Sequence, residues 1–305
     1  MTLVISSLFP VFSLLLLGRL LTQLKLTNDS FLKHSDRLVY FIFFPALLFW
    51  KIGTAETGHF INWDLCLAIV MSIAIIYIIS ALALKLFNIS DFKAGSFSQS
   101  CYRFNTYIGM AIVTYAYGEA GVQHFGILIG IAIPFINILA VSTLIWYSGR
   151  TKSTGSRLFI FFKEIVTNPL VIACVAGLLY ARIIGSFPIY IENSLRLMSA
   201  VALPLALISI GGALTMKSLR GNLALAGIAS IIKLLFLPLV GFWILNVLQV
   251  SGLAFKVGIV FLTLPTSASI YVLSSQLHSD TELASASIVL STILSFISLI
   301  IGLLL

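Results

Sequence analysis

The chain has 305 residues, of which 60% are hydrophobic and 9% charged, and its formal net charge is +8 at pH 7. Soluble domains usually carry about 25% charged residues, so this composition excludes an ordinary water-soluble protein and predicts an exterior that mostly faces lipid. The positive charge does not indicate nucleic-acid binding, because the basic residues lie in short loops between apolar segments and not on one face of a folded domain.

The sequence offers no pattern for metal binding or for enzyme chemistry. Its three cysteines are an odd number in apolar surroundings, and its four histidines are scattered along the chain. It contains no HExxH or GxSxG motif and no pair of aspartates inside an apolar segment. We therefore expect no metal site, no cofactor and no catalytic activity.

Apolar segments that are long enough to cross a membrane follow one another along the whole chain. A helix needs about 20 apolar residues to span the hydrocarbon core. The stretches between charged residues predict ten spans, at 1–18, 38–50, 65–84, 94–117, 120–149, 165–181, 197–216, 221–247, 257–277 and 283–305. The first segment lacks a basic stretch in front of it, so we interpret it as a retained helix and not as a signal peptide.

The basic residues are distributed unevenly between the two sides that ten spans define. Lysine and arginine concentrate in cytoplasmic loops. One side carries twelve of them and the other four: Arg19, Lys25, Lys33, Arg37, Lys85, Lys93, Arg150, Lys152, Arg157, Lys163, Lys217 and Arg220 against Lys51, Arg182, Arg196 and Lys256. This bias predicts a multi-pass protein of the cell membrane, in contact with lipid, with both termini outside the cytoplasm.

The two halves of the chain, 1–150 and 155–305, match one another at a shift of 159 residues. The shift aligns Pro10 with Pro169 and Pro45 with Pro204, among nine identities in 44 positions. Prolines are informative because the chain has only eight. Five spans in each half would give the halves opposite topology, which is typical of secondary transporters. Chance similarity between apolar helices is the alternative.

Polar residues interrupt the fourth and the ninth predicted spans. The fourth contains Arg103, Asn105 and Thr106, and short polar side chains of this kind can satisfy the backbone groups that a local unwinding frees. In the ninth, Pro265 cannot donate a backbone hydrogen bond, and Thr266, Ser267 and Ser269 follow it. The shift places Thr106 opposite Pro265. Each break would leave a helix N-terminus inside the membrane, where its free N–H groups attract anions.

Two cations lie inside predicted spans, and cations in a membrane usually have a function. Arg103 could bind substrate, or its side chain could extend to the headgroups. Lys233 lies near the middle of its span and could bind substrate or stabilise unwound carbonyl groups. All ten acidic residues fall at span ends or in loops, which favours an anion as the transported solute. Asn137 and Tyr107 are further candidates for lining the cavity.

Several segments, in the same order, resemble the auxin efflux carrier family of membrane transport proteins. They are FLKHSDRLVYFIFFPALLF at 31–49, NTYIGMAI at 105–112, YGEAGV at 117–122, LPLALISIGGAL at 203–214 and LPTSASIYVLSSQLHSDTELASASIVLST at 264–292. The chain lacks a long hydrophilic central loop and so is similar to the compact bacterial members.

The resemblance implies an all-α membrane protein of ten transmembrane helices in two inverted five-helix repeats, with crossed, broken helices 4 and 9. It implies a scaffold from 3–52 and 166–216, a transport domain from 63–148 and 221–305, elevator-type alternating access and a homodimer. It also implies that Asn105 holds the substrate carboxylate and that Pro265 marks the second crossover. Phe104 stands where the plant members commonly have a proline.

We therefore predict a secondary transporter for a small organic anion, such as an auxin-like carboxylate or a dicarboxylate. Two alternatives remain. One is a sodium-coupled symporter with a fold like that of the bile-acid symporters, and the other is a membrane sensor that transports nothing. The predicted binding residues are Arg103, Asn105, Thr106, Tyr107, Asn137, Lys233, Pro265, Thr266, Ser267 and Ser269.

Overall fold

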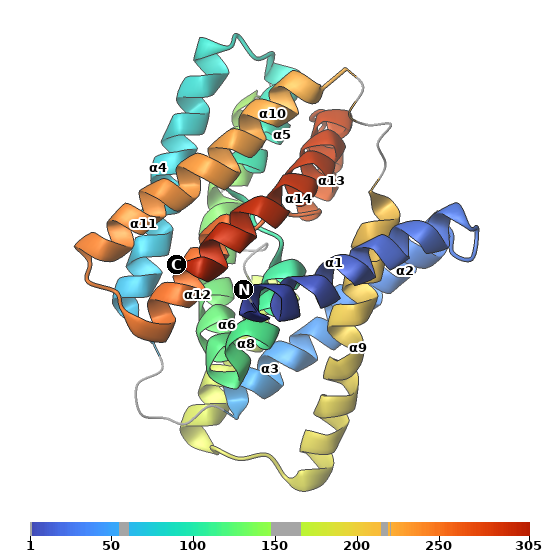
Figure 1. The fold of residues 1–305 in the computed structure, drawn as a ribbon, viewed down its shortest axis with the longest axis vertical. Coiled ribbons are helices and arrows are strands. Elements are labelled where there is room, and N and C mark those ends of the chain that lie inside the picture. The colour runs from blue at the N-terminus through green and yellow to red at the C-terminus, as the bar shows by residue number, and fades with distance from the viewer. Residues whose placement is uncertain (1, 55–60, 148–165, 215–218, 220) are drawn as a thin grey trace. The chain divides into compact units, whose positions relative to one another are not determined.

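The structure is a computed structural model that describes residues 2–54, 61–147, 166–214, 219 and 221–305. The predicted boundary between the halves, at 150–155, lies outside these residues, as does the basic segment 148–157. Every regular element of the described residues is helical (Figure 1). Six helical stretches in this part of the chain are long and apolar enough to cross a membrane, and Pro169–Ile183 and Gly252–Thr263 are shorter apolar helices.

The helices divide between two compact units. Unit 1 is Met1–Trp63, Thr106–Ile131 and Val166–Leu214, and unit 2 is Asp64–Asn105, Ala132–Ile165 and Thr215–Leu305. In unit 1 lie α1 (Thr2–Gln23), α2 (Asp29–Leu38), the π-helix η1 (Val39–Phe43), α3 (Phe44–Gly53), α8 (Pro169–Ile183) and α9 (Ile189–Ala213). Unit 2 contains α4 (Trp63–Leu86), apart from its first residue, which is grouped with unit 1. It also contains α5 (Asp91–Tyr102), α10 (Leu223–Ile231), the π-helix η3 (Ile232–Phe236), α11 (Leu237–Val247), α12 (Gly252–Thr263), α13 (Ser269–Gln276) and α14 (Thr281–Leu304). The long helix α6 (Thr106–Tyr147) contributes to both units.

The helix that contains the second predicted span, 38–50, begins at Asp29, nine residues before the span itself. Asn28 caps α2 because its side-chain oxygen accepts a hydrogen bond from the N–H of Phe31 at 2.8 Å, and Asp29 follows in the first turn. The helix then continues through η1 into α3. Capping and the favourable acidic first turn therefore extend this helix into a segment that is too charged to lie in lipid.

In unit 1, α1 packs along α9 and α3 packs along α8. Glycine allows both approaches. A Cβ atom at Gly18 of α1 would collide with the carbonyl group of Ile208 in α9, and one at Gly177 of α8 would lie 3.2 Å from the carbonyl oxygen of Phe49 in α3. Gly177 follows Gly18 by 159 residues, and Ile208 follows Phe49 by the same number. The two contacts are therefore equivalent under the shift seen in the sequence.

The helix boundaries follow the same shift. Moved by 159 residues, α4 covers 222–245, where α10, η3 and α11 run from 223 to 247. The same operation takes α5 to 250–261, close to the bounds of α12. In α6, Gly118 has non-helical angles of φ 60° and ψ −152°, and its equivalent, Leu277, follows the end of α13. Equivalent segments of the two halves therefore begin and end helices at equivalent places.

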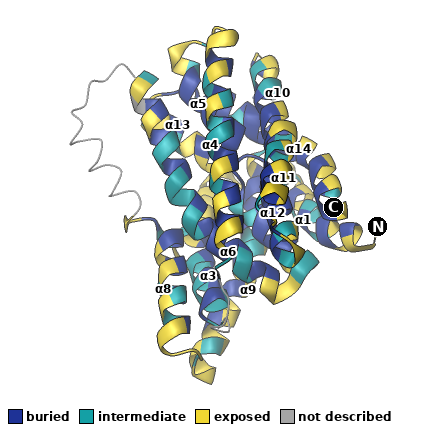
Figure 2. Cartoon of the chain, turned by 90° about the vertical axis from the view of Figure 1, so that its left-hand side faces the viewer, coloured by how far each residue is buried: buried dark blue, intermediate teal, exposed yellow. Residues whose placement is uncertain are grey.

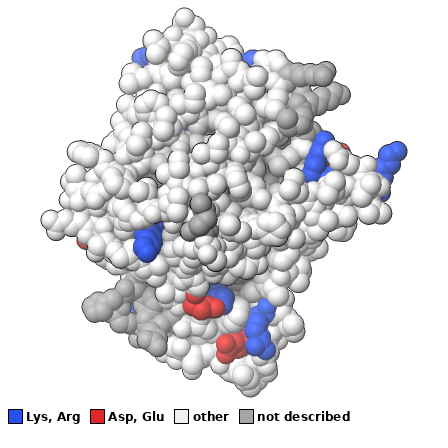
Figure 3. Space-filling model, in the orientation of Figure 1, with Lys and Arg blue, Asp and Glu red and all other residues white. Residues whose placement is uncertain are grey.

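Exposed residues lie along the outer faces of the helices (Figure 2), and many of them are large and apolar. Phe9 of α1 is 70% exposed, Leu197 of α9 72% and Trp243 of α11 65%. Charged residues are sparse on the face drawn in Figure 3. Such a surface is stable in lipid and not in water, so the chain is a multi-pass membrane protein.

The close contact at Gly18 predicts that adding a single methyl group at this position lowers the stability of the protein. Gly18→Ala should destabilise the purified protein by about 1–3 kcal/mol, because the added Cβ meets rigid backbone and forces α1 away from α9. Thermal unfolding in detergent measures this as a lower Tm. The matched control is Gly227→Ala in α10, where nothing lies within 4 Å of the new Cβ. The control should leave Tm unchanged or raise it, and an equal loss in both variants would contradict the prediction.

Candidate functional site

The fourth predicted span is broken at Arg103–Asn105. α5 ends at Tyr102, Arg103 has extended angles of φ −67° and ψ 150°, and α6 begins at Thr106. The break needs no proline at position 104. Phe104 is buried, and its ring packs against that of Phe261 in α12 with centroids 4.2 Å apart. An aromatic contact to the neighbouring interrupted span therefore holds this segment.

The ninth predicted span is broken after Thr263, where α12 ends, and the chain becomes helical again at Ser269, where α13 begins. Pro265 lies inside this break, as its missing N–H group predicts. The backbone N–H of Asn105 donates a hydrogen bond of 2.9 Å to the carbonyl oxygen of Pro265. The two breaks therefore meet inside unit 2, and we call the segments 103–105 and 264–268 together the crossing.

Helix α14 supports the crossing through two serines that sequence reasoning missed. Ser291 accepts a hydrogen bond of 3.2 Å from the backbone N–H of Thr266, and Ser298 donates one of 2.8 Å to the carbonyl oxygen of Thr263. Both side chains therefore satisfy backbone groups at the break beside Pro265. The available signal was the spacing of Ser287, Ser291, Ser295 and Ser298 by three or four residues, which places hydroxyl groups on one face of a helix.

Arg103 points into unit 2 and is only 9% exposed. Its guanidinium donates to the side-chain oxygen of Gln99 at 3.1 Å and to that of Asn137 at 2.7 Å. Gln99 lies on α5 and Asn137 on the part of α6 that belongs to unit 2. The structure therefore brings the predicted residues Arg103 and Asn137 together, next to Asn105, which is 1% exposed.

The hydroxyl groups after Pro265 differ in their surroundings. Thr266 is fully buried, and its Oγ1 has no hydrogen-bond partner among the described residues. Ser267 and Ser269 share a hydrogen bond of 2.8 Å near the start of α13. Helix α13 has eight residues, and the N–H groups of Ser269, Ile270 and Tyr271 in its first turn donate to Ser267 and Ala268. What α13 offers an anion is therefore the partial positive charge at its N-terminus.

The remaining predicted residues lie outside the two segments of the crossing. Lys233 lies in η3 and is fully buried, and no described contact joins it to the crossing. Thr106 and Tyr107 begin the part of α6 that belongs to unit 1, where the Tyr107 ring packs edge-on against that of Phe44 with centroids 4.8 Å apart. Their part in binding stays a prediction. Among the residues that the structure describes, no group of three or more His, Cys, Asp or Glu side chains could hold a metal ion.

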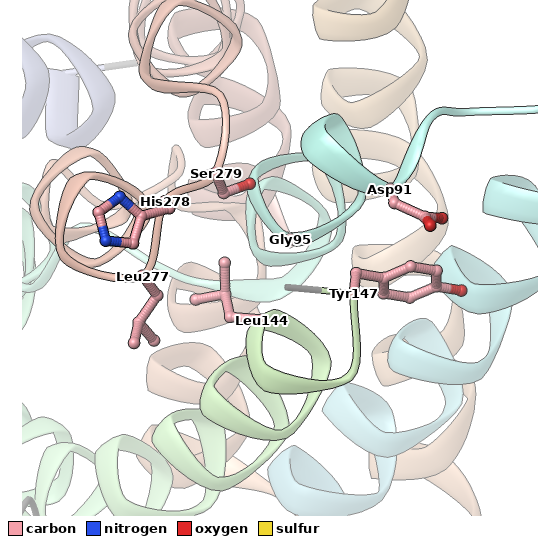
Figure 4. A pocket seen from close by; sticks show the side chains of 7 residues that line it. All are labelled: Asp91, Gly95, Leu144, Tyr147, Leu277, His278 and Ser279. Atoms are coloured by element: carbon pink, nitrogen blue, oxygen red, sulfur yellow. The ribbon is translucent and has the colours of Figure 1, made fainter. Parts of the chain in front are cut away.

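A small depression near the start of α5 is separate from the crossing (Figure 4). Its lining holds none of the predicted binding residues and comprises Asp91, Gly95, Leu144, Tyr147, Leu277, His278 and Ser279. Beside it, the hydroxyl of Ser279 bonds to Ser96 of α5 at 3.0 Å and donates to the carbonyl oxygen of Phe92 at 2.8 Å. These hydrogen bonds join α5 to the segment before α14, and we assign the candidate site to the crossing, which holds several of the predicted binding residues.

Two interrupted helices that meet inside a compact unit, in a chain whose surface is apolar, define a polytopic transport protein. The comparison with known families agrees with this class. A family model described as "Membrane transport protein" matches residues 149–303. The chain belongs to this family, the auxin efflux carrier family.

Two relatives from archaea carry the name "uncharacterized transporter". The chain is 37% identical to the one from Methanothermobacter thermautotrophicus over 102 residues, which is 33% of this chain. That match spans about a third of the relative's length, 34%. The chain is 22% identical to the one from Methanocaldococcus jannaschii over 293 residues, which is 94% of each chain.

The hydrogen bond between Ser291 and Thr266 predicts that the folded protein loses stability when the serine hydroxyl is removed. Ser291→Ala should destabilise the protein by about 1–3 kcal/mol, because it leaves a buried backbone N–H without an acceptor. Thermal unfolding measures the change. Ser295→Ala is the control, since Ser295 is equally buried but donates only to Thr292 of its own helix. A Tm loss in Ser295→Ala as large as in Ser291→Ala would show that Ser291 has no special part.

Proposed function

We propose that this protein is a secondary transporter that moves a small organic anion across the membrane and binds its carboxylate at the crossing. The observation that carries the proposal is the hydrogen bond from the Asn105 N–H to the Pro265 carbonyl oxygen. It joins two interrupted spans at the point where each leaves its helix. Binding sites of secondary transporters are typically built from such discontinuous helices.

The chemistry of the crossing suits a carboxylate. The side-chain amide of Asn105 and the hydroxyls of Thr266 and Ser267 are hydrogen-bond donors, and the N-terminus of α13 adds a partial positive charge. Arg103, bonded to Gln99 and Asn137, adds a positive charge two residues from Asn105. A substrate carboxylate would gain charge-assisted hydrogen bonds, which are stronger than neutral ones. The ten acidic residues lie at span ends or in loops, so the interior of the spans supplies no competing anion.

We further propose the ten-helix architecture of two inverted repeats, with unit 1 as the scaffold, unit 2 as the moving transport domain and a homodimer as the assembly. The equivalent contacts at Gly18 and Gly177 and the equivalent helix boundaries support the repeat. The separation into two compact units supports a scaffold and a transport domain. The units differ from the predicted domains in one segment, because 106–131 is grouped with unit 1.

A sodium-coupled symporter is the second candidate. The crossing contains the carbonyl oxygen of Pro265 and the hydroxyl oxygen of Thr266, and oxygen atoms of these kinds are the ligands of hard cations. Sodium dependence of uptake separates the two candidates, since a carrier that needs no sodium moves substrate equally well in potassium buffer.

Transport itself is tested with the purified protein in liposomes. Uptake of labelled monocarboxylates and dicarboxylates should exceed that of empty liposomes, with and without a sodium or pH gradient. Binding of an organic acid without uptake under any gradient would contradict the transporter and favour the sensor.

Asn105→Ala should lower the affinity for the transported acid about tenfold or more, because a hydrogen bond to a charged group is lost. Concentration-dependent uptake and ligand-induced Tm shifts both measure this affinity. Asn246→Ala is the control, since Asn246 is exposed and donates to Phe242 of its own helix. If uptake by Asn105→Ala equals that of the control, the crossing is not the binding site.

A further inference from the structure

Three polar side chains of unit 2 are buried without partners where α10 and η3 pack against α14. They are Ser230, which is 2% exposed, Lys233, which is 0% exposed, and Ser287, which is 1% exposed. The Oγ atoms of both serines and the Nζ of Lys233 have no hydrogen-bond partner within the described part of the chain. Neither the fold nor the crossing uses these three groups.

The three helices that surround this region begin at one end of unit 2. The Nζ of Lys93, in the first turn of α5, donates to the side-chain oxygen of Asn222 at 3.0 Å and lies 3.9 Å from a carboxylate oxygen of Asp280. Asn222 directly precedes α10, and Asp280 directly precedes α14. All three helices contact one another, and α10 and α14 lie side by side in Figure 1.

From this common end the polar groups reach a similar depth. Cys101 follows Lys93 by eight residues, Ser230 follows Asn222 by eight, and Ser287 follows Asp280 by seven, which corresponds to about 10–12 Å of helix in each case. Lys233 lies about one turn deeper, but helical side chains lean toward the N-terminus of their helix. We therefore expect the ammonium group to lie at about the same depth along the helices as the two serine hydroxyls.

The chemistry of the three groups is that of an anion site. Ser230 and Lys233 are three residues apart and so lie on one face of their helix. The ammonium group has three donors and no acceptor, and each hydroxyl can donate one hydrogen bond. An ammonium group sealed from water needs a counter-ion or acceptors, because its desolvation is otherwise uncompensated.

We propose that Lys233, Ser230 and Ser287 bind a small anionic group at a position separate from the crossing. Ser291, which accepts from Thr266 of the crossing, lies one turn beyond Ser287 on α14. The new position is therefore about 6 Å from the crossing along α14. The anionic group is either a free inorganic ion such as chloride, or the second carboxylate of a dicarboxylate whose first carboxylate binds at the crossing. Only the second source rests on the proposed function.

The experiment compares thermal unfolding of the purified full chain in sodium chloride, sodium malonate, sodium acetate and sodium gluconate at equal ionic strength. A free inorganic ion should raise Tm in chloride relative to gluconate in a concentration-dependent way. A dicarboxylate should instead raise Tm in malonate well above the value in acetate. In either case Ser287→Ala and Ser230→Ala should weaken the apparent affinity about tenfold each, and Lys233→Met should abolish the response.

The control is Lys256→Met, because Lys256 is an exposed lysine of the same unit, and this variant should respond like the wild type. The two serine variants keep the test valid if Lys233→Met does not fold. Equal Tm in all four salts, or a response that survives in the serine variants, would overturn the site. A chloride response that persists when liposomes show no uptake of any organic acid would support the site and contradict only the proposed function.

Discussion

A backbone that leaves its helix inside a membrane exposes N–H and C=O groups where water is not available to satisfy them. The hydrogen bond between the Asn105 N–H and the Pro265 carbonyl oxygen meets this constraint by pairing one break with the other. Ser291 of α14 accepts a hydrogen bond from the freed N–H of Thr266, and Ser298 donates one to the carbonyl oxygen of Thr263. The crossing thus depends on three segments that are far apart in the sequence, because the backbone groups freed in the two breaks find their hydrogen-bond partners in the other break or in α14.

This arrangement explains why unit 2 contains so many buried polar side chains. Ser96, Ser98, Gln99 and Ser100 are almost fully buried in α5, the helix that leads to the first break. Each makes a hydrogen bond, for instance Ser98 with Ser80 of α4 and Ser96 with Ser274 of α13. Hydrogen bonds of this kind hold helices together inside a bilayer, where apolar burial gives little preference for protein over lipid.

Unit 1 uses another means to bring its helices together. Glycines at positions 18, 177 and 211 let α1, α3, α8 and α9 approach until backbone or Cβ atoms touch. Close approach increases dispersion contacts, which are the main attraction between apolar helices in lipid. This device recurs at equivalent positions of the two halves, and the hydrogen-bonded crossing lies in the other unit.

Much of this was determined by the sequence alone. Composition sufficed for the membrane class, because so few charged residues cannot cover a soluble surface, and the local effects of Pro265 and of the polar run near Asn105 predicted both breaks. Only the tertiary structure decided how the breaks pair, that Phe104, at the position where plant members commonly have a proline, packs on Phe261, and that Asn137 meets Arg103. It also placed Lys233 in η3 and brought in the serines of α14. These contacts join residues between 25 and 160 positions apart, and no local pattern specifies which polar group of one helix will face which group of another. Helix propensity, capping and proline act within a turn or two of the chain, whereas the partners of freed backbone groups depend on the packing of whole helices.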